Sequence, residues 1–243
     1  MGKIYGRIPV LEALKAGVNL QTVFLAIGIK GQVIDDIQKQ AKINNIPVSY
    51  ISQTKMETVL GKVNSQGVYA VQTEMNFSSV DEILINAKKK KYPLILILDS
   101  IQDPHNLGAI LRTAEACGVD GVFLTTHNSA KINETVEKTS AGAVFHLKIC
   151  NVANINPIIK ELKKEGYWIF GSMLDNKSKN YTEHDYKLPA AIVLGNEGKG
   201  MHRLTAENCD FLVKIPMMGK IESLNVSVST GVLLYEVLRQ RNS

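Results

Sequence analysis

Short apolar runs alternate with segments of helical periodicity along most of the chain. The runs at 94–98 and 190–194 are continuously apolar, as is typical of strands that are covered on both faces of a parallel sheet. Segments such as 107–117 and 156–165 place apolar residues three or four positions apart, which predicts helices. The alternation of the two patterns predicts an α/β fold built around a parallel sheet.

Two domains are predicted, both α/β and joined near residues 74–80. Residues 92–243 form the larger domain, with strands at 94–98, 121–124, 145–149, 167–171, 190–194 and 211–215 and helices at 107–117, 135–141, 156–165 and 224–241. Residues 1–76 form the smaller one, with helices at 10–17 and 33–45 and strands at 23–26, 47–51 and 66–71. Residues 77–91 are expected to be a linker and a leading helix, capped by Ser78 or Ser79.

Composition is that of an ordinary globular protein. The 243 residues are 45% hydrophobic and 21% charged, and no apolar stretch approaches the roughly 18 residues that a membrane span requires. The N-terminus carries no apolar segment of a secretion signal. From these features we expect no membrane partner, and we predict a cytoplasmic protein.

The net charge of +5 is unevenly distributed. Residues 1–76 hold eight Lys and Arg against five Asp and Glu, whereas residues 92–243 hold sixteen of each. A basic bias confined to one segment favours an anionic partner such as RNA on the N-terminal domain.

Cysteine and histidine spacing predicts neither a disulfide framework nor a metal site. Cys117, Cys150 and Cys209 are an odd number of widely spaced residues without a CxxC pair, so we expect buried thiols in a reducing compartment. The five histidines lack metal-ligand spacing.

Three stretches in the larger domain concentrate Gly, Asn and charged side chains: 103–114, 195–200 and 215–227. Each begins where an apolar strand-like run ends. The carboxyl ends of neighbouring parallel strands open into loops that form a ligand crevice, so we expect the three stretches to build one site.

In the first stretch, Asn106 precedes a predicted helix that starts near Leu107 and would cap it. Arg112 follows about one and a half turns later. A helix N-terminus and an arginine together suit an anionic group such as an RNA phosphate. The alternative is a plain cap and a surface arginine; Gly108, which permits close backbone approach, favours the site.

In the second stretch, Gly195-Asn196-Glu197-Gly198-Lys199-Gly200 is neither a Walker A loop nor a GxGxxG motif, because the spacing and order of its glycines differ. Its exposed backbone groups are suited to hydrogen-bond a heterocycle or an amino acid. Glu197, between the glycines, then requires a cationic partner.

In the third stretch, Ser223 is the expected N-cap of the last helix. Capping leaves Asn225 unexplained, because asparagine is a poor helix former.

These motifs, in this order, resemble those of the SpoU/TrmH 2′-O-ribose RNA methyltransferases of the SPOUT superfamily. The shared patterns are Asn-x-Gly-Ala-Ile-x-Arg-Thr-Ala, Gly-Asn-Glu-Gly-x-Gly and Ser-Leu-Asn-Val-Ser, all within residues 92–243. Residues 5–14 and 66–70 are similar to the small substrate-binding domain of the ribosomal-RNA subgroup.

The resemblance implies a deep trefoil knot in the C-terminal methyltransferase domain, a homodimer, and S-adenosyl-L-methionine as cofactor. It assigns cofactor contacts to Gly195, Ile215 and Leu224. It assigns the catalytic set to Asn106, Arg112, Glu197, Ser223 and Asn225, and no metal.

The expected function is therefore 2′-O-methylation of a guanosine ribose in large-subunit (23S) rRNA, with RNA and not DNA as partner. Arg112, assisted by an RNA phosphate, would help to activate the 2′-hydroxyl; because arginine stays protonated, stabilisation of the developing oxyanion is its expected role. Two alternatives remain open: a tRNA substrate for the same chemistry, and a non-catalytic RNA-binding or ribosome-assembly factor.

Overall fold

The computed structural model describes residues 2–72, 77–196, 198, 200–221 and 223–243. Contacts divide the chain into two compact units, residues 1–76 with 132–146 and residues 77–131 with 147–243. The segment 132–146 thus groups with the N-terminal unit, a feature that the hydropathy pattern did not reveal.

The first unit is a four-stranded mixed sheet with helices. Its strands are β1 (Gly2–Tyr5), β2 (Leu20–Ala26), β3 (Val48–Ile51) and β4 (Val68–Gln72), in the order β1-β4-β2-β3, and its helices are α1 (Arg7–Lys15), α2 (Gln32–Ile43), α3 (Gln53–Leu60), α6 (Glu134–Thr139) and the 3-10 turn η1 (Ala143–Phe145). Buried residues of α1, α2 and the central strands form its core, among them Val10, Leu14, Ile34 and Ile37.

The second unit contains a seven-stranded sheet in which every pair of neighbours is parallel. The strands are β5 (Leu94–Leu98), β6 (Gly121–Thr125), β7 (Ile149–Val152), β8 (Trp168–Ser172), β9 (Lys179–Asn180), β10 (Ala190–Leu194) and β11 (Phe211–Lys214), in the order β7-β6-β5-β10-β8-β11-β9. Its helices are α4 (Val80–Ala87), α5 (Pro104–Ala116), α7 (Ile155–Lys164), α8 (Arg203–Asn208) and α9 (Val226–Arg241), with the 3-10 turn η2 (Tyr181–Glu183). The predicted parallel α/β fold is confirmed; the trefoil knot stays a prediction.

One predicted strand, 145–149, is wrong in its position. Residues Ala143–Phe145 form a 3-10 turn, and the strand runs over Ile149–Val152 instead. Phe145 packs against the core of the first unit. Phe145, an apolar residue that packs in the first unit, was therefore wrongly assigned to a strand of the second unit.

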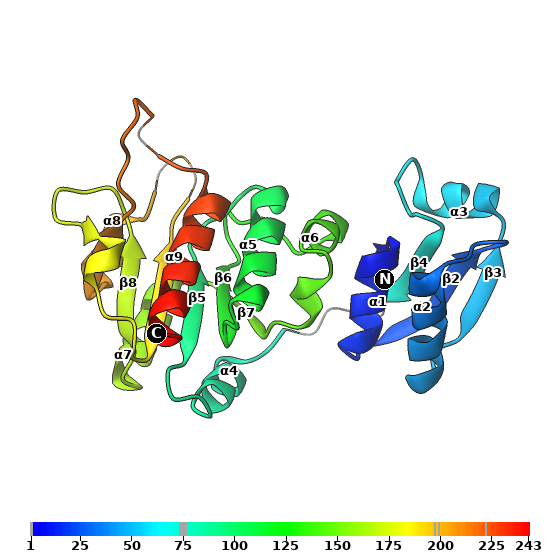
Figure 1. Cartoon of the computed structure of the whole chain (residues 1–243), viewed down its shortest axis with the longest axis horizontal. Helices are drawn as coiled ribbons and strands as arrows, with labels where there is room; N and C mark the ends of the chain where they lie inside the picture. The colour runs from blue at the N-terminus through cyan, green and yellow to red at the C-terminus, as the bar shows by residue number, and fades with distance from the viewer. Residues whose placement is uncertain (1, 73–76, 197, 199, 222) are drawn as a thin grey trace. The chain divides into compact units, whose positions relative to one another are not determined.

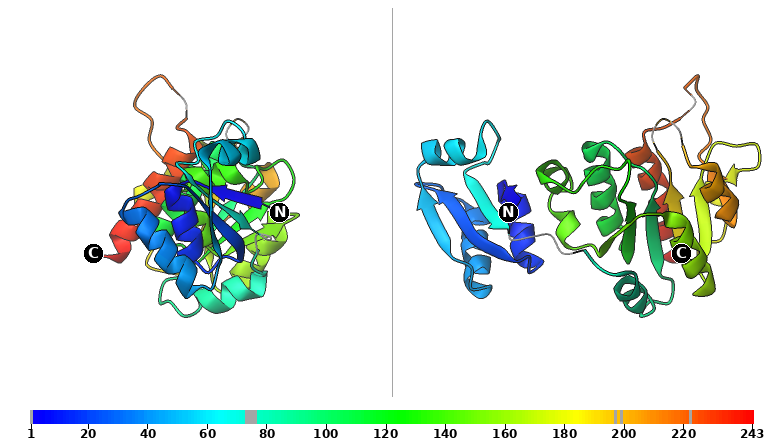
Figure 2. Two further views of the ribbon diagram at one scale, coloured as in Figure 1. Left: turned by 90° about the vertical axis from the view of Figure 1, so that its right-hand side faces the viewer. Right: turned by 180° about the vertical axis from the view of Figure 1, so that it is seen from behind.

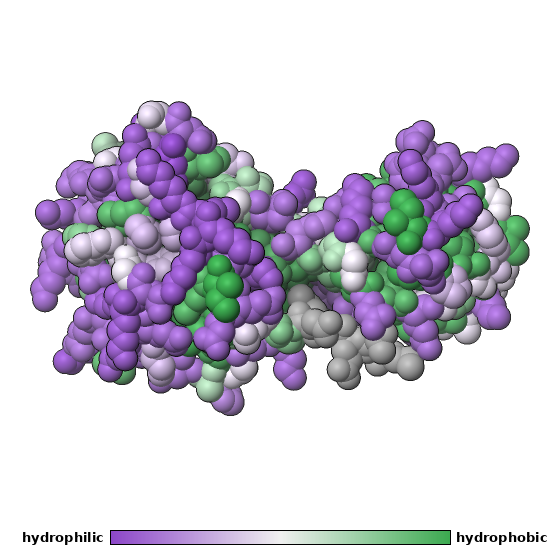
Figure 3. Space-filling view, turned by 90° about the horizontal axis from the view of Figure 1, so that it is seen from below, coloured by the Kyte–Doolittle hydropathy of each residue, from purple (hydrophilic) through white to green (hydrophobic). Residues whose placement is uncertain are grey.

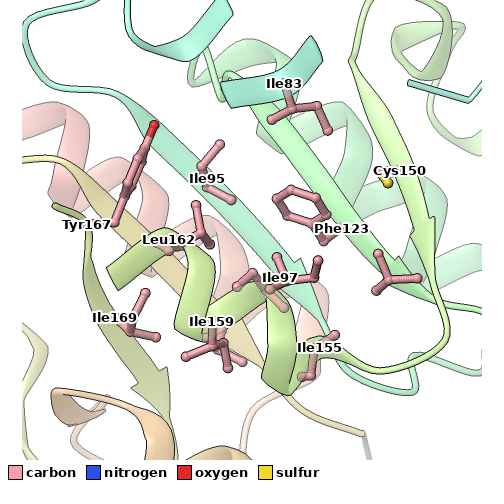
Figure 4. Packing of buried hydrophobic residues seen from close by; sticks show 14 of the residues in the cluster. Ile83, Ile95, Ile97, Phe123, Cys150, Ile155, Ile159, Leu162, Tyr167 and Ile169 are labelled. Atoms are coloured by element: carbon pink, nitrogen blue, oxygen red, sulfur yellow. The ribbon is translucent and has the colours of Figure 1, made fainter. Parts of the chain in front are cut away.

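The strand alternation assigns each face of the central sheet to a different pair of helices. Ile95 and Ile97 of β5 face α4 and α7, and Figure 4 shows Ile159 and Leu162 of α7 directed toward them. The intervening residues of β5 point to the opposite face, where α5 and α9 lie side by side (Figures 1 and 2).

The surface of the chain is mainly hydrophilic on the face shown in Figure 3. In the lysine run after α4, two side chains are ion-paired: Lys90 contacts the buried carboxylate of Asp120 at 2.7 Å, and Lys88 contacts Glu165. Within the described residues, no helix has the length and apolar character needed to cross a membrane.

Candidate active site

A cavity of about 380 Å³ lies at the carboxyl ends of three neighbouring strands, β10, β8 and β11. The loops that leave these strands and the start of α9 form its walls, with Ser172, Met173, Leu174, Leu194, Gly195, Asn196, Gly198, Gly200, Lys214, Ile215, Met217, Ser223, Leu224, Val226 and Ser229 as lining residues. The cavity has the size and the mixed apolar and polar lining of a small-molecule site. It brings together residues of the second and third sequence motifs, as predicted.

The loop after β10 folds tightly on itself at Gly195. Asn196 and Gly200 exchange backbone hydrogen bonds of 3.0 and 2.9 Å. A β-carbon on Gly195 would lie 2.4 Å from the backbone of both Gly200 and Met201. Only glycine fits here, because the backbone of Gly200 and Met201 fills the space that a side chain would occupy.

All three predicted cofactor residues, Gly195, Ile215 and Leu224, line this one cavity. Ile215 follows β11, and Leu224 precedes α9. Ser223 lines the same cavity, adjacent to Leu224. Met217 is also a lining residue.

Asn225 joins the first motif to the third. Its Nδ2 donates a hydrogen bond of 3.0 Å to Oδ1 of Asn106. Its own Oδ1 accepts the backbone N–H of Ser227 at 2.8 Å and the Ser227 hydroxyl at 2.6 Å. Asn225 therefore caps α9, and the expectation that Ser223 is the cap is wrong. Both residue types cap helices well, so the sequence did not distinguish them.

The expected cap at Asn106 is also wrong. The helix α5 begins at Pro104, and the side chain of Asp103 accepts the backbone N–H of His105 at 2.8 Å. Proline is favoured at the first helical position, and the helix begins three residues before the predicted start at Leu107. Asn106 thus lies inside the first turn, where its side chain is available to Asn225.

Arg112 is exposed and is not among the residues that line the cavity of its own chain. It follows Asn106 by six residues, which places it about 120° around the helix and about 9 Å further along it. The side of α5 that carries Arg112 is therefore not the side on which Asn106 contacts Asn225.

Two further polar residues need comment. Glu197, predicted to belong to the catalytic set, lies outside the described residues. Asn196, which the motif contained but to which we gave no role, donates from Nδ2 to the backbone carbonyl of Ser100 at 2.9 Å. This bond ties the glycine loop to the end of β5.

The cysteine thiols are unsuited to nucleophilic chemistry. Burial raises the pKa of the Cys209 thiol to about 12 and that of Cys117 to about 11. Burial likewise raises the pKa of the Cys150 thiol. Thiols with such pKa values stay protonated at neutral pH. The described residues also contain no group of His, Cys, Asp and Glu arranged to hold a metal ion.

Two family models match the chain over almost its whole length. The model of the SpoU rRNA methylase family matches residues 93–235, and the model of the RNA 2′-O-ribose methyltransferase substrate-binding domain matches residues 3–78.

Relatives in sequence and in structure agree with these models. A protein of Staphylococcus epidermidis named as a TrmH family tRNA/rRNA methyltransferase is 40% identical over 240 residues, which cover 98% of this chain and 96% of that protein. The crystal structure of an S-adenosyl-L-methionine-bound rRNA methyltransferase from Sinorhizobium meliloti is 25% identical with a TM-score of 0.82, covering 98% of this chain and 87% of that one. The methyltransferase AviRb from Streptomyces viridochromogenes, in complex with the same cofactor, has the same fold, with 22% identity, a TM-score of 0.83 and coverage of 99% and 90%.

The fold and the cavity define an α/β protein with a pocket suited to a small molecule, and the comparisons show that it is an enzyme and define its class. The chain belongs to the SpoU rRNA methylase family, and it is an S-adenosyl-L-methionine-dependent RNA 2′-O-ribose methyltransferase.

The cavity fits this cofactor by its chemistry. Apolar side chains of Leu174, Ile215 and Leu224 suit the adenine ring, and the backbone of Gly195, which also lines the cavity, supplies polar groups. When bound, S-adenosyl-L-methionine supplies the methyl group.

Proposed function

We propose that this enzyme methylates the ribose 2′-oxygen of a guanosine in 23S rRNA and that it works as a homodimer in the cytoplasm. Support for an rRNA substrate comes from the two-domain layout, in which a basic N-terminal domain precedes the methyltransferase domain. In length and layout the chain resembles the 23S rRNA guanosine-2′-O-methyltransferase RlmB. The observation that supports the methyl-transfer part of the proposal is the convergence of Gly195, Ile215 and Leu224 on one cavity.

Each polar residue has a distinct part in the proposed reaction. The hydrogen-bonded amides of Asn106 and Asn225 link the start of α5 to the start of α9. This pair positions the ribose beside the cavity. Ser223, on the cavity wall, contributes a hydroxyl to the same pocket. The guanidinium of Arg112 stabilises the negative charge that develops on the 2′-oxygen as its proton leaves.

Arg112 needs a second copy of the chain to perform this role. It does not line the cavity of its own chain, so the arginine that serves a given cavity comes from the partner protomer. In the dimer that we propose, each of the two sites is completed by the other chain.

The exposed side of α9 provides a surface for that second copy. Val228 and Tyr235 are 50% and 54% exposed, and seven residues, about two turns, place them on one side of the helix. The opposite side buries Leu233 and Val237 in the domain core. A helix that is apolar on both sides is typical of a buried element, and a second copy covers the outer side.

The competing substrate is tRNA. The Staphylococcus epidermidis relative carries both tRNA and rRNA in its name, and the cavity itself does not distinguish the two. The difference lies in the first unit, whose basic excess suits a large folded RNA.

Mapping of 2′-O-methyl sites in RNA from a gene-deletion strain tests the proposal. We expect one guanosine in 23S rRNA to lose its modification while every tRNA site is retained. Loss of a tRNA site, with 23S rRNA unchanged, would select the alternative. Re-expression of the wild-type gene serves as the control.

A further inference from the structure

A second cavity, of about 350 Å³, lies at the carboxyl ends of β5, β6 and β7. It shares no lining residue with the cavity at β10, β8 and β11. The two cavities adjoin where β5 and β10 pair, because Leu98 and Leu194 are partners in register and the backbone N–H of Asp99 donates to Leu194. Paired strands lie about 4.8 Å apart, so the two cavities are close neighbours on one sheet edge.

The floor of this second cavity holds a buried carboxylate paired with an exposed imidazole. Asp99 is 4% exposed, and its Oδ2 lies 2.8 Å from Nδ1 of His202, whose side chain is 64% exposed. The hydroxyl of Ser100 donates to the other oxygen, Oδ1, at 3.1 Å. Asp99 thereby fixes the orientation of the His202 ring and leaves its Nε2 edge directed away from the carboxylate.

The remaining polar groups of this cavity are amides, hydroxyls and a second imidazole. His127, Asn128 and Asn154 line it, and within the described residues no lysine or arginine does. A phosphate would require cationic donors, so it is a poor fit. A metal ion is a poor fit as well, since no group in the described part of the chain has the arrangement to hold one.

A nucleobase fits this lining. Amides and imidazoles offer donors and acceptors to a base edge, and imidazole and aliphatic surfaces offer stacking area. Ile155 and Leu204 supply the aliphatic surface. The cavity volume falls within the range of pockets that enclose small molecules.

We propose that this second cavity is a subsite for the base of a nucleotide next to the methylated one, with His202 as the specificity-determining contact. The inference rests on the proposed function, because it supposes an RNA strand that crosses the sheet edge. The target ribose lies at the cofactor cavity, and the neighbouring base enters the cavity beside it.

Two conservative substitutions test the subsite. His202→Asn keeps an N–H donor for Asp99 at the position of Nδ1 and removes the outer part of the imidazole ring. The substitution costs α8 no cap, because the His202 side chain makes no capping hydrogen bond to this helix. Asn154→Ser removes an amide and retains a good cap for α7, whose N-cap residue is Asn154. Thr126→Ala is the matched control, a nearby exposed polar side chain outside the cavity.

The measurement is steady-state methylation of a 23S rRNA transcript, with fluorescence anisotropy of RNA binding alongside. We expect His202→Asn to raise KM and Kd for RNA about tenfold, the size of one good base contact. Turnover, cofactor affinity and Tm should match those of Thr126→Ala. An abasic site at one flanking nucleotide should weaken wild-type binding by a similar factor and should not weaken the variant further.

Two results would overturn the subsite. In the first, His202→Asn and Asn154→Ser bind RNA as tightly as the control variant does. In the second, the abasic site weakens RNA binding by the variant as much as it weakens binding by the wild type. A fall in Tm and cofactor affinity together with the RNA effect would assign His202 to the fold instead. Absence of methyl transfer by the wild type, with the anisotropy pattern intact, would contradict the proposed function alone.

Discussion

Asn225 donates a hydrogen bond of 3.0 Å to Asn106 across 119 positions of sequence. The same asparagine caps α9 through its Oδ1. One side chain therefore fixes the start of the last helix and, at the same time, joins it to the first turn of α5. The first and third sequence motifs are coupled through this single residue.

The two tasks of Asn225 are separable by substitution. Asn225→Ser retains a capping oxygen and loses the donor to Asn106, so we expect an unchanged Tm and a reduction of kcat by about tenfold. Asn225→Ala loses both groups and should also reduce the free energy of unfolding by about 1 kcal/mol. Thermal denaturation and single-turnover kinetics measure the two effects. Equal kcat for Asn225→Ser and wild type would show that the pair only supports the fold.

Gly195→Ala should displace the loop that forms one wall of the cofactor cavity. The added β-carbon meets backbone atoms of Gly200 and Met201 at 2.4 Å, and backbone cannot yield as a flexible side chain does. We expect the Kd for S-adenosyl-L-methionine, measured by calorimetry, to rise at least about tenfold, which corresponds to about 1.4 kcal/mol. Gly219→Ala is the control, because no atom lies within 4 Å of its added carbon. Cofactor affinity equal in the two variants would contradict the assignment of this cavity.

Arg112→Ala should reduce kcat by about 100-fold or more, the usual effect of removing a stabiliser of an oxyanion. Cofactor affinity should not change, because the proposed role of Arg112 is at the ribose 2′-oxygen and not at the cofactor. Glu115→Ala, an exposed residue of the same helix, is the control.

Mixing the Arg112→Ala and Gly195→Ala proteins tests whether the arginine acts across subunits. In a mixed dimer, one site combines an intact Gly195 loop with the partner's intact arginine, so activity should recover to about a quarter of the wild-type value for random exchange of protomers. The shared site would be refuted if the protein is a monomer in analytical ultracentrifugation. It would also be refuted if activity does not recover in mixtures whose protomers are shown to exchange.

The sequence predicted the strands in the middle of the sheet well. It predicted the positions at which helices begin, and the short helices, less well. Strands β5 and β10 are apolar on both faces, so their pattern has no competing interpretation. The short helices α3 and α8 contain one buried residue each, Met56 and Thr205. They carry almost no apolar periodicity, and we did not predict them.

The convergence of the three motifs on one sheet edge was predictable because parallel strands end together. The true caps, Asn225 and Asp103, were not predictable, since several residues near each helix start are equally good caps. The pairing of Asp99 with His202 joins residues 103 positions apart. The only signal in the sequence was the position of Asp99, a polar residue directly after an apolar strand.

Stability should depend on pH through Glu137 in α6. Burial, and secondarily the charge of Glu134, raises the pKa of the Glu137 carboxyl to about 7, and its Oε2 is buried without a hydrogen-bond partner among the described residues. Below pH 4.5 the carboxyl is protonated in both the folded and unfolded states and has no effect. Between pH 4.5 and 7 only the unfolded state ionises, so the folded state loses up to about 3 kcal/mol, and the loss is complete above pH 7.

Glu137→Gln should therefore raise Tm at pH 8 and leave it nearly unchanged at pH 4.5. Glu57→Gln, at an exposed position of the same unit, should alter Tm little at either pH. Thermal denaturation across this pH range measures the difference. A Tm gain independent of pH would show that the Glu137 carboxyl titrates at its ordinary pKa.

Transfer of tritiated methyl from S-adenosyl-L-methionine tests the central claim most directly, with the wild-type protein offered 23S rRNA and total tRNA from the deletion strain. We predict incorporation into 23S rRNA at about one methyl group per molecule, within a dinucleotide that resists alkaline hydrolysis because its 2′-oxygen is blocked. Label in tRNA alone, label on a base instead of a ribose, or no label in either RNA would contradict the account.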